Sequence, residues 1–320
     1  MGTGKIIEGK KAEKFTITKL PSVLAGAGKV WNDHDPWRLG AVVAYYALLS
    51  LPGLLIVTVT AVGAIWGAKL VEGEITGQIE DVVGSDVAES VQSIIDSAQL
   101  GEQSLLMTIV GIAILLFGAT GVFYHLQLSL NALWDIRQEP ESNILKLLID
   151  RAVSFGFVLV IGFLLLISFI VSALLSAFAD FLATIWEPAY VVAAQIVDFV
   201  ISTGVITVLF ALMFRFLPDA RVRWLTIWRG ALLTAILFNL GVFALGYYFG
   251  KASPGSMYGA AGSVVALLLW ISYACLIFFY GAALVRYYEE RFGAGIRPRG
   301  SAVQVTYEPR VVSEGKKDED

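Results

Sequence analysis

The 320-residue chain contains one cysteine and two histidines. Cys275 lies in an apolar run, where we expect a small buried side chain, and a single cysteine excludes an internal disulfide and cysteine-based zinc motifs. His34 and His125 are far apart in sequence, so the paired-histidine metal motifs are absent. A Walker A phosphate loop is absent too, which excludes ATP hydrolysis by that route. We therefore expect no metal and no cofactor.

Charge is also scarce. Charged residues make up 16% of the chain, against about 25% in an average soluble domain. Hydrophobic residues make up 57%, and the mean hydropathy is +0.73. These values predict an all-α integral membrane protein. Six apolar runs are long enough to cross a bilayer as helices, at about 39–66, 105–124, 152–175, 191–214, 225–249 and 264–285.

The distribution of positive charge predicts which side each loop occupies. All but two of the 23 Lys and Arg residues lie in segments 1–38, 125–151, 215–229 and 286–320. The exceptions are Lys69 and Lys251. Because positive loops stay inside, we expect a multi-pass membrane protein with both termini in the cytoplasm. The tail 286–320 is charged and lacks apolar periodicity, which predicts disorder.

Two segments outside the apolar runs have a helical pattern. Segment 67–103 carries one cation, eight acidic residues and two apolar stripes, which predicts a small extracytoplasmic helical hairpin. Segment 1–38 begins as a basic arm, and apolar residues recur at helical spacing over 19–32. This helix would lie on the membrane surface or would be a lead-in packed on the bundle.

A sided polar stripe follows the second apolar run. Over residues 118–134 one helical face carries Thr120, Tyr124, Gln127 and Asn131. The opposite face carries Val122, Phe123, Leu126, Leu130 and Leu133. We interpret the stripe as facing a partner helix or a water-filled recess. The alternative is that it only packs against other helices, with each polar group hydrogen-bonded.

Other polar residues lie inside the predicted spans. Asp198 would bind a cation or carry a proton, or it would merely reach headgroup water, and Ser202 lies one turn away on the same face. Asn239 is more typical of an interhelical hydrogen bond than of a ligand contact. Pro52 is expected to kink or break the first span. Our hypothetical substrate pathway comprises Tyr45, Ser50, Thr120, Tyr124, Gln127, Asn131, Asp198, Ser202 and Asn239.

Four arginines lie in segment 215–229, which joins the fourth span to the start of the fifth, and Trp224 and Trp228 are interleaved with them. Basic residues among aromatics suggest nucleic acid or anionic lipid headgroups. The membrane context favours lipid, so we expect membrane lipids and not nucleic acid as partners. The proposed headgroup contacts are Arg215, Arg221, Arg223 and Arg229.

Four stretches resemble the YihY/BrkB family of six-span inner-membrane proteins. They are AVVAYYALLSLPGLL (41–55), GATGVFYHLQLSLNALWDI (118–136), RFLPDARVRWLTIWRGALL (215–233) and YGAAGSVVALLLWISYACLIFFYGAALVRYYEER (258–291). The resemblance implies the fold and the compartment. It also brings an old label of tRNA-processing ribonuclease and, for some members, a role in virulence or serum resistance.

The ribonuclease label finds little support in the residues. Such an enzyme needs an acid–base set or a metal centre. The only dense polar cluster is Asn32 to Asp35, whose consecutive residues in a turn cannot all converge on one metal. We therefore predict a non-enzymatic protein that handles a lipid-like or small charged solute in the manner of a transporter. The alternative is an envelope scaffold that recruits a partner through segment 67–103.

The charge distribution makes a testable prediction about topology. Alkaline phosphatase, which is active only outside the cytoplasm, should be active when fused after residue 90 and inactive when fused after residue 320. Activity measured on intact cells checks this. An active fusion at residue 320 would contradict a cytoplasmic C-terminus.

Overall fold

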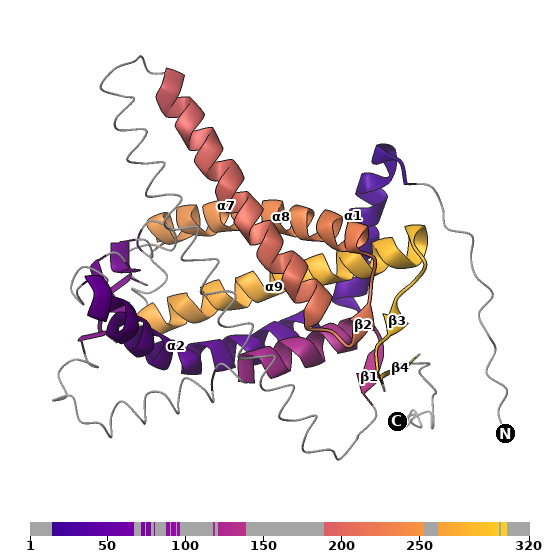
Figure 1. The fold of residues 1–320 in the computed structure, drawn as a ribbon, viewed down its shortest axis with the longest axis horizontal. Helices are drawn as coiled ribbons and strands as arrows, with labels where there is room; N and C mark the ends of the chain where they lie inside the picture. The colour runs from indigo at the N-terminus through magenta and orange to yellow at the C-terminus, as the bar shows by residue number, and fades with distance from the viewer. Residues whose placement is uncertain are drawn as a thin grey trace, which may run out of the picture.

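The computed structural model describes residues 15–66, 118, 121–138, 189–252, 262–300 and 302–305, with short runs and single positions between 72 and 96. The long helices are α2 (Pro36–Trp66), α7 (Ala189–Phe216), α8 (Trp224–Ala252) and α9 (Gly262–Phe292). Shorter ones are η1 (Ile17–Lys19), α1 (Leu20–Asn32) and a helix over 121–133. Helix α9 runs through the middle of the bundle and contacts α1, α2 and α8, while α7 crosses α8 (Figure 1).

Three of the predicted spans are confirmed as long apolar helices. The described helices contain stretches able to cross a membrane at Phe199–Phe216, Trp224–Tyr248 and Val264–Phe292. They correspond to the fourth, fifth and sixth predicted spans. The third predicted span and nearly all of the second lie outside the described residues.

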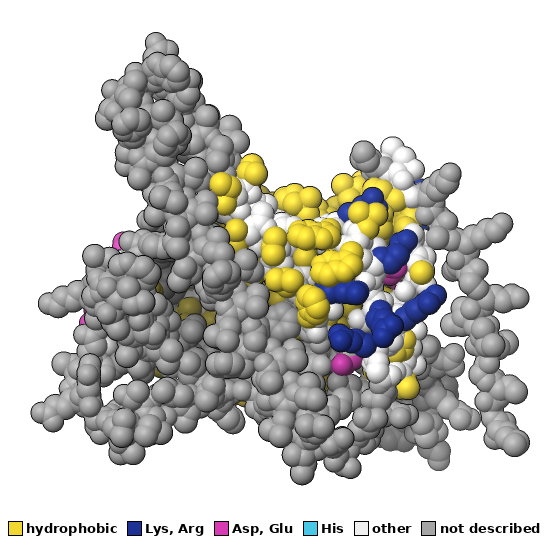
Figure 2. All heavy atoms as spheres, in the orientation of Figure 1, with side chains coloured by type: hydrophobic (Ala, Val, Ile, Leu, Met, Phe, Trp, Pro, Cys, Tyr) yellow, Lys and Arg dark blue, Asp and Glu magenta, His cyan; other side chains and the backbone are white. Residues whose placement is uncertain are grey.

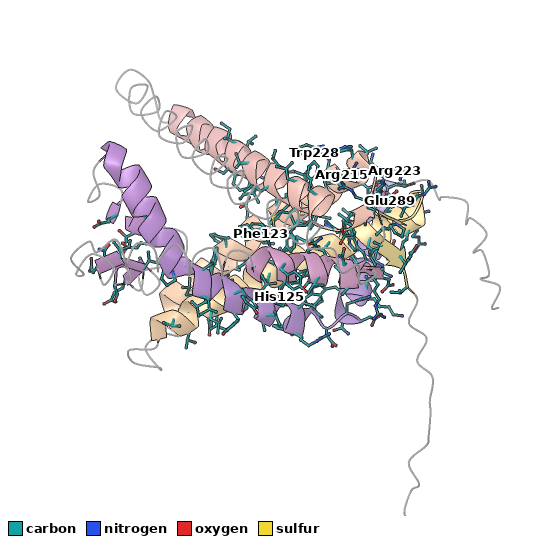
Figure 3. All side chains as sticks on the ribbon, turned by 60° about the horizontal axis from the view of Figure 1, so that its bottom comes forward. Phe123, His125, Arg215, Arg223, Trp228 and Glu289 are labelled. Atoms are coloured by element: carbon teal, nitrogen blue, oxygen red, sulfur yellow. The ribbon has the colours of Figure 1, made fainter. Side chains whose placement is uncertain are left out.

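Pro52 does not break the first helix, contrary to the stronger form of the prediction. Helix α2 is continuous from Pro36 to Trp66 with Pro52 inside it, and it bends partway along its length (Figure 3). Proline removes one backbone donor and crowds the preceding turn, which bends a helix without ending it when neighbouring contacts hold both halves. Ser50 donates to the carbonyl of Ala47 at 2.9 Å within the same helix.

Helix α1 packs on the bundle, as in the second of the two interpretations. Val23 and Ala27 are buried in a cluster with Leu284, Tyr288 and Phe292 near the C-terminal end of α9. The Tyr280 hydroxyl donates to the carbonyl of Leu24 at 2.9 Å.

The tail from 286 is ordered over its first part, which corrects the prediction of disorder there. Helix α9 continues to Phe292 and is followed by β3 (Arg297–Pro298) and β4 (Ala302–Gln304). Strand β3 pairs antiparallel with β2 (Ala220–Arg221), and β4 with β1 (Ile136–Gln138). Strands of two or three residues are too short to show a hydropathy pattern. These strands are ordered because they pair with segments distant in the sequence. Residues 306–320 lie outside the described residues.

The described positions of the acidic segment are helical. Val91 and Ile95 are buried, and Ile75 and Leu51 pack against them. The apolar stripes of this segment therefore meet each other and α2 at these positions. The path of the predicted hairpin between them lies outside the described residues.

Small residues bring α8 and α9 close together. A Cβ built on Gly281 would lie 2.0 Å from the Thr234 hydroxyl oxygen, and one on Gly230 would lie 2.3 Å from Val285 Cγ2. Ala231, Ala235, Ala282 and Ala283 are fully buried along the same helices. Interfaces of this kind hold membrane helices by close packing because lipid supplies no hydrophobic force between them.

The outer face of α8 matches the dimensions of a bilayer. Trp228, Leu232, Ile236, Leu240, Phe243 and Tyr247 are all exposed. Tyr247 lies 19 residues after Trp228, and at a rise of ~1.5 Å per residue the two are about 29 Å apart along the helix, close to the ~30 Å hydrocarbon thickness. Hydrophobic side chains cover this face, and Lys and Arg side chains gather at the end near β2 and β3 (Figure 2).

Close packing at Gly281 predicts that Gly281→Val destabilises the bundle. The added side chain must displace Thr234, and overpacking of this kind costs roughly 1–3 kcal/mol or more. The measurement is the thermal unfolding midpoint of the protein in detergent. Gly204→Val is the matched control, because no atom lies within 4 Å of a Cβ at Gly204. Equal midpoints for the two variants would contradict the packing argument.

Candidate functional site

The polar end of the bundle is built from segments far apart in sequence. It contains the end of helix 121–133, the loop between α7 and β2, the start of α8 and the last turns of α9, joined by the two strand pairs. These are parts of the segments that the charge distribution predicts to be cytoplasmic. Three clusters of buried polar groups lie here, around Asp219, Glu289 and Arg286.

The first cluster joins helix 121–133 to the loop after α7. Asn131 Nδ2 donates to Asp219 Oδ2 at 2.7 Å, and Asn131 Oδ1 accepts from the Asp219 backbone N–H at 2.9 Å. Gln127 Nε2 donates to the same carboxylate oxygen at 3.1 Å. Because Asn131 is only 4% exposed, this reciprocal pair fixes the loop against the helix.

The second cluster surrounds a buried carboxylate. Glu289 is 1% exposed and accepts hydrogen bonds from Arg223 Nε at 2.9 Å, from the Thr226 hydroxyl and from the backbone N–H of Ala294 at 3.2 Å. Arg223 also donates to the carbonyl of Phe292 at 3.2 Å. The buried charge is thus paired and fully hydrogen-bonded, and it ties β2 and α8 to the end of α9.

The third cluster has Arg286 at its centre. Arg286 donates to the carboxylate of Asp135 and to the carbonyl of Leu133, and its Nε donates to Glu290 at 2.9 Å. His34 Nδ1 lies 2.7 Å from the Val30 carbonyl, and its Nε2 lies 3.3 Å from Asp135 Oδ1. Asp135 has φ +53°, a left-handed conformation that ends helix 121–133 and turns the chain into β1.

The predicted stripe is in contact with protein at its inner end. Gln127 and Asn131 bind Asp219, whereas Tyr124 is exposed and makes an edge contact with His125. Thr120 lies outside the described residues. Tyr45 is exposed and lies against Tyr46, whose ring stacks on His125 with centroids 4.6 Å apart. Ser50 faces Gly118, where a Cβ would lie 2.5 Å from the Ser50 Cβ.

The other proposed pathway residues lie on α7 and α8. Asn239 Nδ2 donates to the Thr203 hydroxyl at 2.8 Å, an interhelical hydrogen bond. Ser202 is half-buried on α7. Asp198 belongs to the same helix, but its side chain lies outside what the structure describes. The structure therefore joins Gln127 to Asn131 through Asp219, and it places Asn239 and Ser202 in another part of the bundle.

The four predicted headgroup arginines differ in their surroundings. Arg215 donates to the Val222 carbonyl at 2.6 Å and lies 5.2 Å from the centre of the Trp224 ring. Arg229 donates to the Tyr288 hydroxyl. Arg223 belongs to the Glu289 cluster, and Arg221 is exposed in β2. Arg215, Arg223 and Glu289 gather at one end, whereas His125 and Phe123 lie farther along the bundle (Figure 3).

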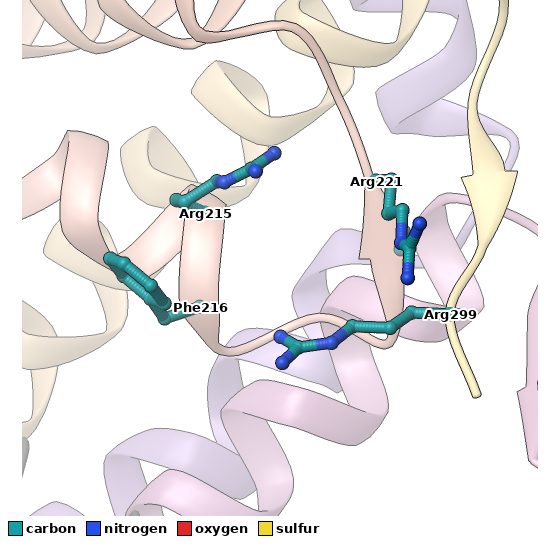
Figure 4. Close-up of a pocket in the computed structure, with 5 residues that line it drawn as sticks. Arg215, Phe216, Arg221 and Arg299 are labelled. Atoms are coloured by element: carbon teal, nitrogen blue, oxygen red, sulfur yellow. The ribbon is translucent and has the colours of Figure 1, made fainter.

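Two hollows flank this end. A cavity of about 260 Å³ is lined by Arg215, Phe216, Ala220, Arg221 and Arg299 (Figure 4). An open groove of about 600 Å³ lies between α7 and α8 and is lined by Ile201, Gly204, Val205, Thr207, Val208, Trp228, Arg229 and Leu232. The first is cationic, and the second is apolar with one cation.

Three residues at the polar end, Asp219, Glu289 and Arg299, were not among the predicted site residues. Asp219 follows Pro218 in a predicted link, and Glu289 and Arg299 belong to the supposed disordered tail. The signal available in the sequence was the pair Glu289-Glu290 directly after an apolar helix, where a carboxylate needs a partner. Among the described residues no three His, Cys, Asp or Glu side chains could hold a metal ion together.

The apolar helices, the lipid-sized exposed face and the basic end define a helical membrane protein. The chain belongs to the Virulence factor BrkB family, whose sequence model matches residues 27–305. The family predicted from the four sequence stretches is thereby confirmed.

Curated relatives carry the name UPF0761 membrane protein. The one from Verminephrobacter eiseniae is 26% identical over 245 residues, which cover 73% of this chain and 56% of the relative. The one from Teredinibacter turnerae is 25% identical, with 80% and 58% covered, and the one from Haemophilus influenzae is 24% identical, with 82% and 93% covered. The chain thus spans just over half the length of the first two. No solved structure matches it.

The Glu289 cluster predicts that Arg223→Leu destabilises the protein by roughly 2–4 kcal/mol, because a buried carboxylate loses its charged partner. Because the Arg223 side chain is 52% exposed, the loss of unfolding free energy should be smaller than for a fully buried ion pair. Chemical denaturation in detergent measures it.

Two comparisons make this test specific. Arg38→Leu removes an arginine whose pair with Asp35 is exposed on both sides, and it should change stability by less than ~1 kcal/mol. The double variant Arg223→Leu with Glu289→Leu should lose less than the sum of the single losses. Additive losses would show that the two side chains are not coupled.

Proposed function

We propose that this membrane protein binds an anionic, lipid-like amphiphile in the groove between α7 and α8 and moves it relative to the bilayer. The observation that supports this is the groove itself. It opens on the exposed, apolar face of the bundle, so its contents would come from the membrane and not from water. Gly204 leaves open space on its α7 side, since a Cβ there would meet nothing within 4 Å.

The lining of the groove suits an acyl chain below a charged headgroup. Ile201, Val205, Val208 and Leu232 offer only apolar surface. Trp228 and Arg229 lie near the start of α8, where we place the boundary of the hydrocarbon layer. Aromatic rings and cations are favoured at this boundary because they contact lipid headgroups. One N–H of Arg229 donates to Tyr288, and a guanidinium has five donors. Among the described residues the other donors of Arg229 have no hydrogen-bond partner, so an anionic group could accept from them.

Of the two solutes that the sequence suggests, this proposal favours a lipid-like solute over a small charged one. Gln127 and Asn131, which would have lined a water-filled recess, are engaged by Asp219. Asn239 is engaged by Thr203. A pathway for ions needs polar groups available to replace water of hydration, whereas a pathway for an amphiphile needs an apolar surface with charge at one end.

Binding is tested with bimane attached to single cysteines in a Cys275→Ala background, at Val205 in the groove and at Phe243 on the open lipid face. Brominated phosphatidylglycerol should quench the probe at 205 more than brominated phosphatidylcholine does. The two brominated lipids should quench the probe at 243 equally. Arg229→Gln should remove the preference at 205, which we expect to be about fivefold for one cation near the surface. Arg38→Gln removes a charge elsewhere and should leave the preference unchanged.

Movement is tested in vesicles that contain the purified protein and fluorescent phosphatidylglycerol, with dithionite reporting the lipid in the outer leaflet. The protein should accelerate the exchange, and Val205→Trp, which fills the groove, should slow it relative to Val205→Ala. Rates equal to protein-free vesicles would overturn the transport proposal. If deletion of 72–100 then abolished cellular function while the bundle still folded, the scaffold alternative would replace it.

A further inference from the structure

The 260 Å³ cavity at the polar end is surrounded by three arginines that come from three places in the chain. Arg215 lies at the end of α7, Arg221 in β2 and Arg299 directly after β3. The pairing of β2 with β3 brings Arg299 beside Arg221, and the Arg299 backbone N–H donates to the Asp219 carbonyl at 2.8 Å. Figure 4 shows Arg221 and Arg299 adjacent, with Arg215 across the loop.

These three guanidinium groups have no carboxylate partner among the residues that the structure describes. Other arginines at the same end do have one, since Arg223 pairs with Glu289 and Arg286 with Asp135. The acidic residue nearest in sequence to Arg215 and Arg221 is Asp219, and its carboxylate is bound by Gln127 and Asn131 of helix 121–133. Three like charges around one cavity repel each other, and an anion between them would remove that repulsion.

The cavity is also partly preorganised. The guanidinium of Arg215 is held by the Val222 carbonyl and by the face of Trp224, and Phe216 forms an apolar wall. A planar guanidinium presents parallel N–H donors that match two oxygens of a phosphate. The volume accommodates a phosphate group together with several waters, each of which takes about 30 Å³.

We propose that Arg215, Arg221 and Arg299 form a binding site for a phosphate group, supplied by an anionic lipid headgroup or by free phosphate. The site is separate from the α7–α8 groove and stands on its own residues. It adjoins Trp224, whose ring centre lies 5.2 Å from the Arg215 guanidinium, at the end of the bundle that the charge distribution predicts to be cytoplasmic. Phosphates at this level belong to lipid headgroups or to the adjoining solution.

The test uses the full chain in non-ionic detergent and isothermal titration calorimetry with three probes. They are inorganic phosphate, dihexanoyl phosphatidic acid and dihexanoyl phosphatidylcholine. Arg221→Gln with Arg299→Gln should weaken binding of the phosphate-bearing anion at least about tenfold, because two charge-assisted contacts are lost. The matched control is Arg137→Gln with Arg297→Gln, which removes two exposed charges from β1 and β3 outside the cavity lining. It should bind like the parent.

Each outcome distinguishes a source or overturns the site. Binding of phosphatidic acid without binding of inorganic phosphate identifies a headgroup site, and tight binding of inorganic phosphate identifies a free-phosphate site. Arg221→Lys with Arg299→Lys should fall between parent and glutamine variant, because charge remains without the paired donors. No binding by the parent, or equal weakening in the control, would overturn the proposal. Val205→Trp should leave phosphate binding intact, so failure of the groove proposal remains a separate result.

Discussion

The polar end of this protein depends on one constraint, which is that the carboxylate of Glu289 is buried and must be neutralised where it lies. Burying a charge is costly unless it is paired and hydrogen-bonded. Arg223, Thr226 and the backbone of Ala294 meet that need, and they lie between β2 and α8, in the first turn of α8 and after the end of α9. The position of β2, the first turn of α8 and the turn after α9 are therefore set together. The three-arginine cavity lies among these same elements.

The bilayer explains why much of the fold was predictable. The apolar runs ending near Phe214 and Val285 are long because a helix must cross about 30 Å of hydrocarbon, and α7 and α9 follow them. The interhelical role expected for Asn239 agrees with its hydrogen bond to Thr203. Length and hydropathy are sufficient to predict a single membrane helix, because its backbone hydrogen bonds are all made within the helix.

Outside the spans, contacts distant in sequence decide the structure, and a local pattern does not reveal them. The sequence around Arg299 and Ala302 predicts an unstructured tail, because strands of two or three residues such as β3 and β4 are too short to show a periodic pattern. Helical spacing puts Asn131 on a polar face, but its hydrogen-bond partner, Asp219, is 88 residues away. The sequence indicated that the stripe needed a partner and contained no signal for which one.

The strand pairs also set an order for the chain's synthesis. Ile136 pairs with Gln304, and Arg221 pairs with Arg297, so each pair waits for a segment that the ribosome makes after α9. Until residues 302–304 have left the ribosome, β1 lacks its partner strand β4, and until residue 299 has left it the cavity lacks Arg299. The membrane helices can insert and pack before then. The basic end therefore forms after the helix bundle. A nascent chain in the bilayer would have packed helices before its three-arginine cavity could bind an anion.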